Sequence, residues 1–154
     1  MRLLGLDPGT TETGFVVTSD DGTVLDCGVK PNDAILDAIL SDWRSCADEM
    51  AVEMIASYGL PVGRETFETV LWIGRFVQAW GGLHRLVYRR EVRRHLCGTD
   101  RAKDPHVRQA LLDLYGGSAA VGTKKAPGPL YRVKSHAWSA LAVAVTARGM
   151  AVAA

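Results

Sequence analysis

The stretch that most constrains this chain is its first one, Arg2 to Val17, which reads RLLGLDPGTTETGFVV. An apolar run ends at Asp7, a Pro-Gly-Thr turn follows, and the chain resumes at Gly14. This pattern predicts two hairpin strands that hold one carboxylate at a fixed point. Burying an unpaired carboxylate is costly, so Asp7 requires a cation or a hydrogen-bond donor. Asp7 is therefore a candidate for metal binding or phosphate chemistry, the alternative being a turn residue bonded to its own backbone.

The length and composition are those of one ordinary globular domain. The chain has 154 residues, of which 47% are hydrophobic and 23% charged, so we expect a single domain over residues 1–154. No apolar run approaches the ~20 residues that span a bilayer, and Asp7 interrupts the start too early for a signal peptide. The three cysteines are widely spaced and form no C-x-x-C pair. They indicate reduced thiols, and hence a cytoplasmic protein with no membrane partner.

Charge is divided unevenly along the chain. Residues 1–83 carry five Lys or Arg against 13 Asp or Glu, whereas residues 84–134 carry 12 Lys or Arg against four Asp or Glu. Such a division is typical of an acidic catalytic half and a basic half that meets a polyanion. Any single basic residue is better explained as part of a solvated helix face. The clustering of these residues is what favours the polyanion.

The first half of the chain predicts four strands and a helix. A third strand is expected over residues 23–29, which makes an antiparallel meander of the first three. A short amphipathic helix then starts with Asn32 or Asp33 as its cap. The next apolar run, AVEMI, is a fourth strand that contains one acid, Glu53. An acid in a buried strand is either a rim residue or a functional one, and the presence of Asp7 on another strand favours function.

The second half begins with a helix over residues 64–80 that has more than one apolar stripe. This helix either packs on the sheet and on a partner subunit, or is buried all round. The remaining expected elements are a strand at 83–88, helices at 91–96 and 103–115, a small-residue loop at 116–129, and a helix at 135–147. Ser135 is the expected N-cap of this last helix. The spacing of three and four residues places His136, Ser139 and Val143 on one face of it.

The predicted fold class is α/β, with a mixed five-stranded sheet flanked by helices. The order of three strands, helix, strand, helix, strand and helices resembles a ribonuclease-H-like domain, in which carboxylates on central strands meet a ligand from the last helix. Phosphodiester hydrolysis needs an activated water and neutralised phosphate charge, which two divalent cations supply. Mg²⁺ prefers hard oxygen ligands and keeps several waters, so two or three carboxylates suit it.

The sequence resembles the RuvC-type Holliday-junction resolvases over almost its whole length. The resemblance is carried by GLDPGTTETGFVV at residues 5–17, AVEMI at 51–55 and SHAWSALAVAV at 135–145. It implies that Asp7 and Glu53 bind Mg²⁺ or Mn²⁺ in a two-metal site.

Two positions at the start of the last helix complete the catalytic set that the resemblance implies. The first, His136, is either a further metal ligand or a general base, whereas an isolated histidine there would more often be a capping or core residue. The second, Ser139, departs from the family, which usually has Asp. A hydroxyl is a poorer ligand with no charge, so one metal binds weakly, one metal binds through a water held by Ser139, or the protein is impaired.

The resemblance and the charge map together imply a homodimer that binds branched DNA. The helix over residues 64–80 is the expected dimer interface, since a four-way junction has paired strands to cut. Tyr58 is a candidate for stacking on bases, with Arg64 nearby. Phosphate contacts are expected from the following basic residues: Arg85, Arg89, Arg90, Arg93, Arg94, Arg101, Lys103, Lys124, Lys125, Arg132 and Lys134.

The sequence therefore predicts a metal-dependent, structure-selective endodeoxyribonuclease that resolves four-way (Holliday) DNA junctions by symmetric phosphodiester hydrolysis. Two alternatives stay open. One is a YqgF-like nuclease that acts on RNA, and the other, suggested by Ser139, is a junction-binding protein with weak or no cleavage. The expected location is the cytoplasm of a bacterial or phage-infected host cell, and the altered metal motif would suit a phage or prophage protein.

Overall fold

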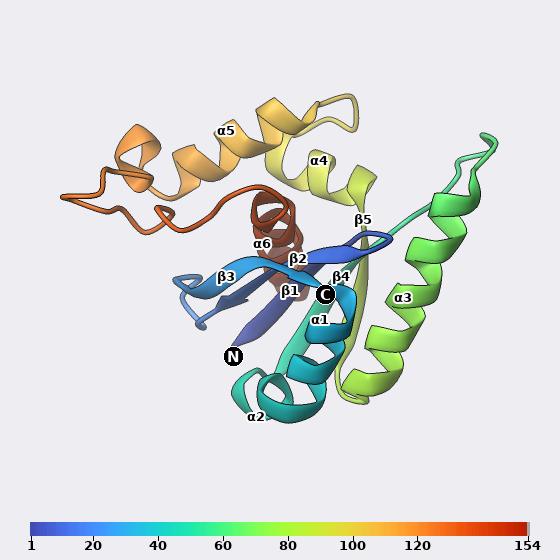
Figure 1. The fold of residues 1–154 in the computed structure, drawn as a ribbon. Helices are drawn as coiled ribbons and strands as arrows, with labels where there is room; N and C mark the ends of the chain where they lie inside the picture. Colours follow the sequence, from blue (N-terminus) through green and yellow to red (C-terminus); the bar gives the residue numbers. More distant parts are fainter. Residues whose placement is uncertain (154) are drawn as a thin grey trace.

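The chain builds one five-stranded sheet around its opening hairpin. In the computed structural model, which describes residues 1–153, the strand order is β3-β2-β1-β4-β5 (Figure 1). The strands are β1 (Leu3–Pro8), β2 (Glu12–Thr18), β3 (Val24–Pro31), β4 (Glu49–Met54) and β5 (His84–Tyr88). The first three pair antiparallel, whereas β4 pairs parallel with β1 and β5 pairs parallel with β4. The predicted mixed sheet, a meander followed by parallel strands, is confirmed.

Helices cover both faces of the sheet, because successive side chains of each strand point to opposite sides. On one side lie α1 (Asn32–Ala38), the π-helical turn η1 (Ile39–Trp43), the short α2 (Arg44–Cys46) and α3 (Arg64–Trp80). On the other side lie α4 (Arg89–Cys97), α5 (Asp104–Leu114), the 3-10 turn η2 (Gly117–Ala120) and α6 (Ala137–Ala153). Leu4 and Leu6 of β1 pack toward α1 and α3, whereas Leu3 packs toward α6.

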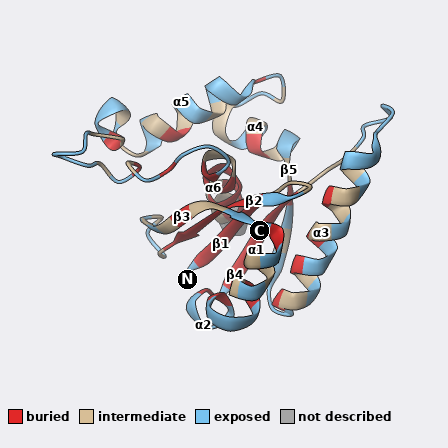
Figure 2. Cartoon of the chain, viewed as in Figure 1, coloured by how far each residue is buried: buried red, intermediate tan, exposed pale blue. Residues whose placement is uncertain are grey.

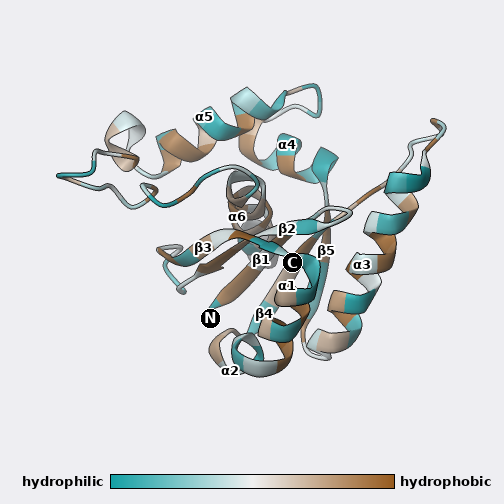
Figure 3. Ribbon diagram, viewed as in Figure 1, coloured by the Kyte–Doolittle hydropathy of each residue, from teal (hydrophilic) through white to brown (hydrophobic). Residues whose placement is uncertain are grey.

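Helix α6 is the buried helix of the fold, and two glycines allow it to lie against the sheet. Figure 2 shows this helix as buried, and Figure 3 shows apolar residues running through it and through β1. A Cβ atom on Gly14 of β2 would lie 2.3 Å from the carbonyl oxygen of His136, and one on Gly5 of β1 would lie 2.6 Å from that of Ala140. The backbone of α6 therefore approaches β1 and β2 as closely as only glycine permits.

Both predicted helix caps are wrong. Asn32 is the first residue of α1, and its buried side chain accepts a hydrogen bond from the Thr13 hydroxyl (2.6 Å) and donates one to the carbonyl oxygen of Gly9 (3.0 Å). Asn32 thereby fastens the turn that follows Asp7. Ser135 has a left-handed φ of 52°, not the extended geometry of an N-cap, and α6 begins two residues later at Ala137.

One predicted phosphate contact lies at the opposite end of the sheet from Asp7. The Arg85 guanidinium forms an ion pair with Glu49, which is fully buried at the start of β4. A buried charge needs its partner, so Arg85 stabilises Glu49, and its contact with phosphate stays a prediction. Within residues 1–153, none of the helices has the length and apolar character that crossing a membrane requires.

We expect Gly14→Ala to lower the free energy of unfolding by about 1–3 kcal/mol, because the added methyl group has no space beneath the start of α6. Urea unfolding followed by circular dichroism measures this change. An unchanged unfolding midpoint would contradict the close packing of α6 on β2.

Candidate active site

Two carboxylates meet at the carboxyl ends of neighbouring parallel strands. Asp7 ends the apolar part of β1, and Glu53 lies near the end of β4. The residues that precede these two acids, Leu6 and Val52, are paired in the sheet. Leu6 and Val52 point to the α1 and α3 side, so the acids that follow point to the α6 side. Their residues are only 8% and 9% exposed. The fold therefore places two nearly buried acids side by side.

Two nearly buried carboxyl groups that lie side by side disfavour each other's negative charge. Burial raises the pKa of Asp7 well above its usual range, and the adjacent Glu53 carboxylate raises it further. Burial also acts to raise the pKa of Glu53, but the hydrogen bond with Asp7 and the Arg89 guanidinium outweigh it and hold that pKa low. The pair therefore resists a second negative charge unless a further cation joins it.

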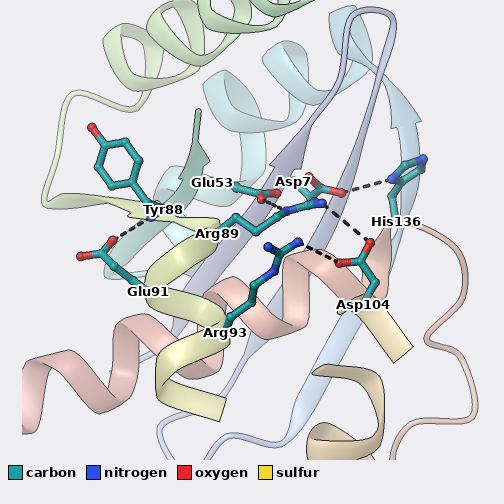
Figure 4. Close-up of polar contacts among 8 residues, drawn as sticks. All are labelled: Asp7, Glu53, Tyr88, Arg89, Glu91, Arg93, Asp104 and His136. Carbon is teal, nitrogen blue, oxygen red and sulfur yellow. Dashed lines mark hydrogen bonds and ion pairs between the residues drawn. The ribbon is translucent and has the colours of Figure 1, made fainter. Parts of the chain in front are cut away.

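The start of α6 supplies the other two predicted catalytic residues. His136 immediately precedes α6, and its Nδ1 lies 3.1 Å from Oδ2 of Asp7 (Figure 4). Ser139 lies one turn further along and acts to lower the pKa of Asp7 through a hydrogen bond. The structure thus brings Asp7, Glu53, His136 and Ser139 to one place. The residues come from β1, β4 and α6, which are distant in sequence.

Arginine side chains enter the same site from α4. Arg89 is the first residue of α4, and its Nε lies 2.9 Å from Oε1 of Glu53. Its Nη1 lies 3.7 Å from Asp104 at the start of α5, and Arg93 approaches the same aspartate at 3.9 Å (Figure 4). From the sequence, Arg89 and Arg93 are predicted only as phosphate contacts, and Asp104 lies in the helix expected at 103–115. Arg89 begins α4, which starts two residues earlier than expected.

A cleft of about 620 Å³ opens over the carboxylates, between the exit of β4 and helix α4. Arg90 and Arg101 line it together with Asp7 and Glu53. Tyr58 stands on its rim, half exposed, with the Arg90 guanidinium 3.9 Å from the centre of its ring. A second cavity of about 390 Å³ lies behind Glu53 and Arg89, against α5 and α6. The acids therefore face an open, arginine-rich groove.

The other predicted DNA contacts are spread over a wider surface. Arg90 and Arg94 share one carboxylate, that of Asp100, at 3.6 Å each. Arg64 pairs with Glu68 along α3, whereas Tyr58 stacks on Arg90. Arg132 is exposed and pairs with Asp26 of β3 at 3.3 Å. The remaining residues of this set are exposed on loops or at the start of α5: Lys103, Lys124, Lys125 and Lys134.

The chemistry of the donors fits a divalent cation. Asp7 and Glu53 present hard carboxylate oxygens to a cleft that admits water, which is the ligand type that Mg²⁺ and Mn²⁺ prefer. Among the residues that the structure describes, no three His, Cys, Asp or Glu side chains are arranged to hold a metal ion. Direct ligation by His136 therefore stays a prediction, and the two carboxylates are the donors that the geometry provides.

No protein-family model matches the chain, and no curated relative matches it. Two similar solved structures are those of Thermus thermophilus RuvC and of T. thermophilus RuvC in complex with a Holliday junction substrate. The first has 21% identity and a TM-score of 0.71 and covers 99% of this chain and 97% of that one. The second has 23% identity and a TM-score of 0.70 and covers 97% and 96%. This likeness spans both chains and confirms the predicted ribonuclease-H-like fold.

Proposed function

We propose that this protein is a metal-dependent, structure-selective endodeoxyribonuclease that resolves four-way DNA junctions. The observation that carries the proposal is the buried Asp7–Glu53 pair beneath an arginine-rich cleft. It is supported by a fold that matches, over nearly the full length, a protein solved with a Holliday junction substrate. Such an enzyme would work in the cytoplasm of a bacterial or phage-infected host cell.

Each residue of the site has a separate part in hydrolysing a phosphodiester. Asp7 and Glu53 would hold Mg²⁺ or Mn²⁺, which when bound offsets charge on the phosphate and lowers the pKa of water. His136 lies against Asp7 with more than half of its side chain exposed, so it would receive a proton from the attacking water. The Ser139 hydroxyl has no charge to contribute and would orient groups by hydrogen bonding.

The cleft would guide the DNA strand to the carboxylates. Arg90, Arg93 and Arg101 line it and would contact phosphates, so affinity for DNA should fall steeply as salt rises. Tyr58 on the rim would stack on a base at the junction, an interaction worth roughly 1–3 kcal/mol. The exposed Lys124 and Lys125 would extend the contact along a neighbouring arm.

A second copy of the chain would complete the enzyme. A junction presents two equivalent strands, and cutting both requires two sites related by a two-fold axis. Helix α3 turns Phe67 and Leu71 outward, 65% and 66% exposed, beside an apolar groove that contains Gly74. Pairing two such faces would bury Phe67 and Leu71 of each copy, and Gly74 would allow the two α3 helices to approach closely.

The proposal is tested by incubating the wild-type protein and Asp7→Asn with a synthetic four-way junction and Mg²⁺. The wild type should nick opposite strands symmetrically. Asp7→Asn should bind the junction with unchanged affinity but lose at least about 10³-fold in rate, because it removes a metal ligand. Wild-type activity in Asp7→Asn would refute the site.

The same assay separates the two alternatives. Cleavage of RNA alone would indicate an RNA nuclease. A junction that is shifted in the gel and never cut would indicate a binding protein. Ser139 favours this alternative because a serine in place of aspartate leaves the site with one carboxylate fewer.

Affinity for Mn²⁺ should rise with pH. Because burial raises the pKa of Asp7, a cation must displace the proton of the pair, and a higher pH makes that displacement easier. The release of one proton raises the affinity for Mn²⁺ by at most about tenfold per pH unit. Calorimetry from about pH 6 to about pH 8, in buffers of different ionisation enthalpy, measures both affinity and proton release. His136→Gln is the control and should keep the slope, whereas a pH-independent affinity without proton release would exclude a shared proton.

Phe67→Glu should convert a dimer into monomers, because a charge would be buried between the α3 helices. Light scattering coupled to size-exclusion chromatography gives the mass. Leu114→Glu, at a similarly exposed leucine of α5, is the matched control and should stay dimeric. A wild type that is monomeric at tens of micromolar would contradict this interface.

A further inference from the structure

The charges of the site do not balance if it holds two divalent cations. Two such cations, Arg89 and Arg93 carry six positive charges, whereas Asp7, Glu53, Asp104 and a phosphodiester carry four negative ones. Position 139 offers a hydroxyl where a further carboxylate would reduce the excess. One divalent cation together with Arg89 and Arg93 gives four positive charges and matches the four negative ones. Unbalanced charge beside the nearly buried Asp7 and Glu53 is costly, so the balanced arrangement is favoured.

Arg89 is held where a second positive charge is needed. Its Nε donates to Glu53 at 2.9 Å, and Asp104 lies 3.7 Å from its Nη1 on the other side. The Asp104 side chain is 73% exposed, so its attraction for Arg89 is weakened by water. In Figure 4 the guanidinium lies between the carboxyl groups of Glu53 and Asp104. The arginine is thus anchored mainly through Glu53.

Most of the hydrogen-bonding capacity of Arg89 is still free. A guanidinium has five N–H donors, and the bond to Glu53 uses the single one on Nε. The side chain is 46% exposed and lines the cleft beside Asp7 and Glu53. Its terminal nitrogens can therefore donate to two oxygens of one phosphate, the geometry in which arginine binds phosphate most strongly.

We propose that the site binds one divalent cation, and that Arg89 supplies the second positive charge by donating hydrogen bonds to the scissile phosphate. This inference rests on the proposed nuclease function and specifies how it works. Arg89 is then a catalytic residue that contacts substrate. Its bond to Glu53 orients the guanidinium before DNA arrives, and Ser139 is compatible with activity because no second cation requires a carboxylate there.

Counting bound Mn²⁺ by calorimetry tests the inference independently of cleavage. The wild type should bind one Mn²⁺ per chain. Arg89→Ala should still bind one, about tenfold more tightly, because a positive charge beside Glu53 has been removed. Arg89→Ala combined with Ser139→Asp should bind two, since it exchanges the guanidinium for a third carboxylate. Arg44→Ala, which removes an exposed arginine on α2, is the control and should change neither number nor affinity.

Cleavage rates provide the second readout. Arg89→Ala should lose about 10²–10³-fold in kcat on the junction, as expected for one lost donor to a developing charge, and Arg89→Lys should lose less because it keeps the charge. If Arg89→Ala does not fold by circular dichroism, Arg89→Gln replaces it, with the same tighter Mn²⁺ binding expected.

Two Mn²⁺ ions per wild-type chain, or weaker Mn²⁺ binding in Arg89→Ala or Arg89→Gln, would overturn the inference. These results are distinguishable from failure of the proposed function. A protein that cuts junctions with two bound ions refutes only the role of Arg89, whereas one that binds a single ion and never cuts DNA or RNA refutes the nuclease itself.

Discussion

The structure depends on the pairing of two carboxyl groups that are almost fully buried. Asp7 and Glu53 lie on adjacent parallel strands, so the sheet itself forces them together. Burial and the neighbouring carboxylate raise the pKa of Asp7, so a cation that replaced its proton would relieve the repulsion between the two groups. The arginines of α4 and the histidine before α6 are arranged around this charge, and the cleft above it gives a substrate access.

The position of α6 relative to β1 and β2 makes this arrangement possible. Gly5 and Gly14 remove the side chains that would otherwise separate the helix from the sheet, and the helix then delivers His136 to Asp7. The opening stretch therefore does more than present an acid at a turn. Its glycines also determine how closely the last element of the chain approaches that acid, which links sequence positions 129 residues apart.

Much of the fold and the central acids could be predicted from the sequence, because they depend on local patterns. Apolar runs ended by turns predicted the five strands along the chain, and the apolar pattern correctly predicted the helix over residues 64–80. The contact between Arg89 and Glu53 could not be predicted, since it joins the start of α4 to β4 across 36 residues and no local pattern reports it. The cap assignments failed for a related reason: Asn32 bonds to Thr13 on another strand, and no local pattern reports that partner.

The proposed function depends on a divalent cation bound by the Asp7–Glu53 pair. Anomalous diffraction from a crystal of the protein containing Mn²⁺ would locate this cation. We expect an anomalous peak at the two carboxylates, with the Arg89 guanidinium adjacent and no second peak at Ser139. No peak at the pair, in crystals that bind Mn²⁺ elsewhere or not at all, would contradict it.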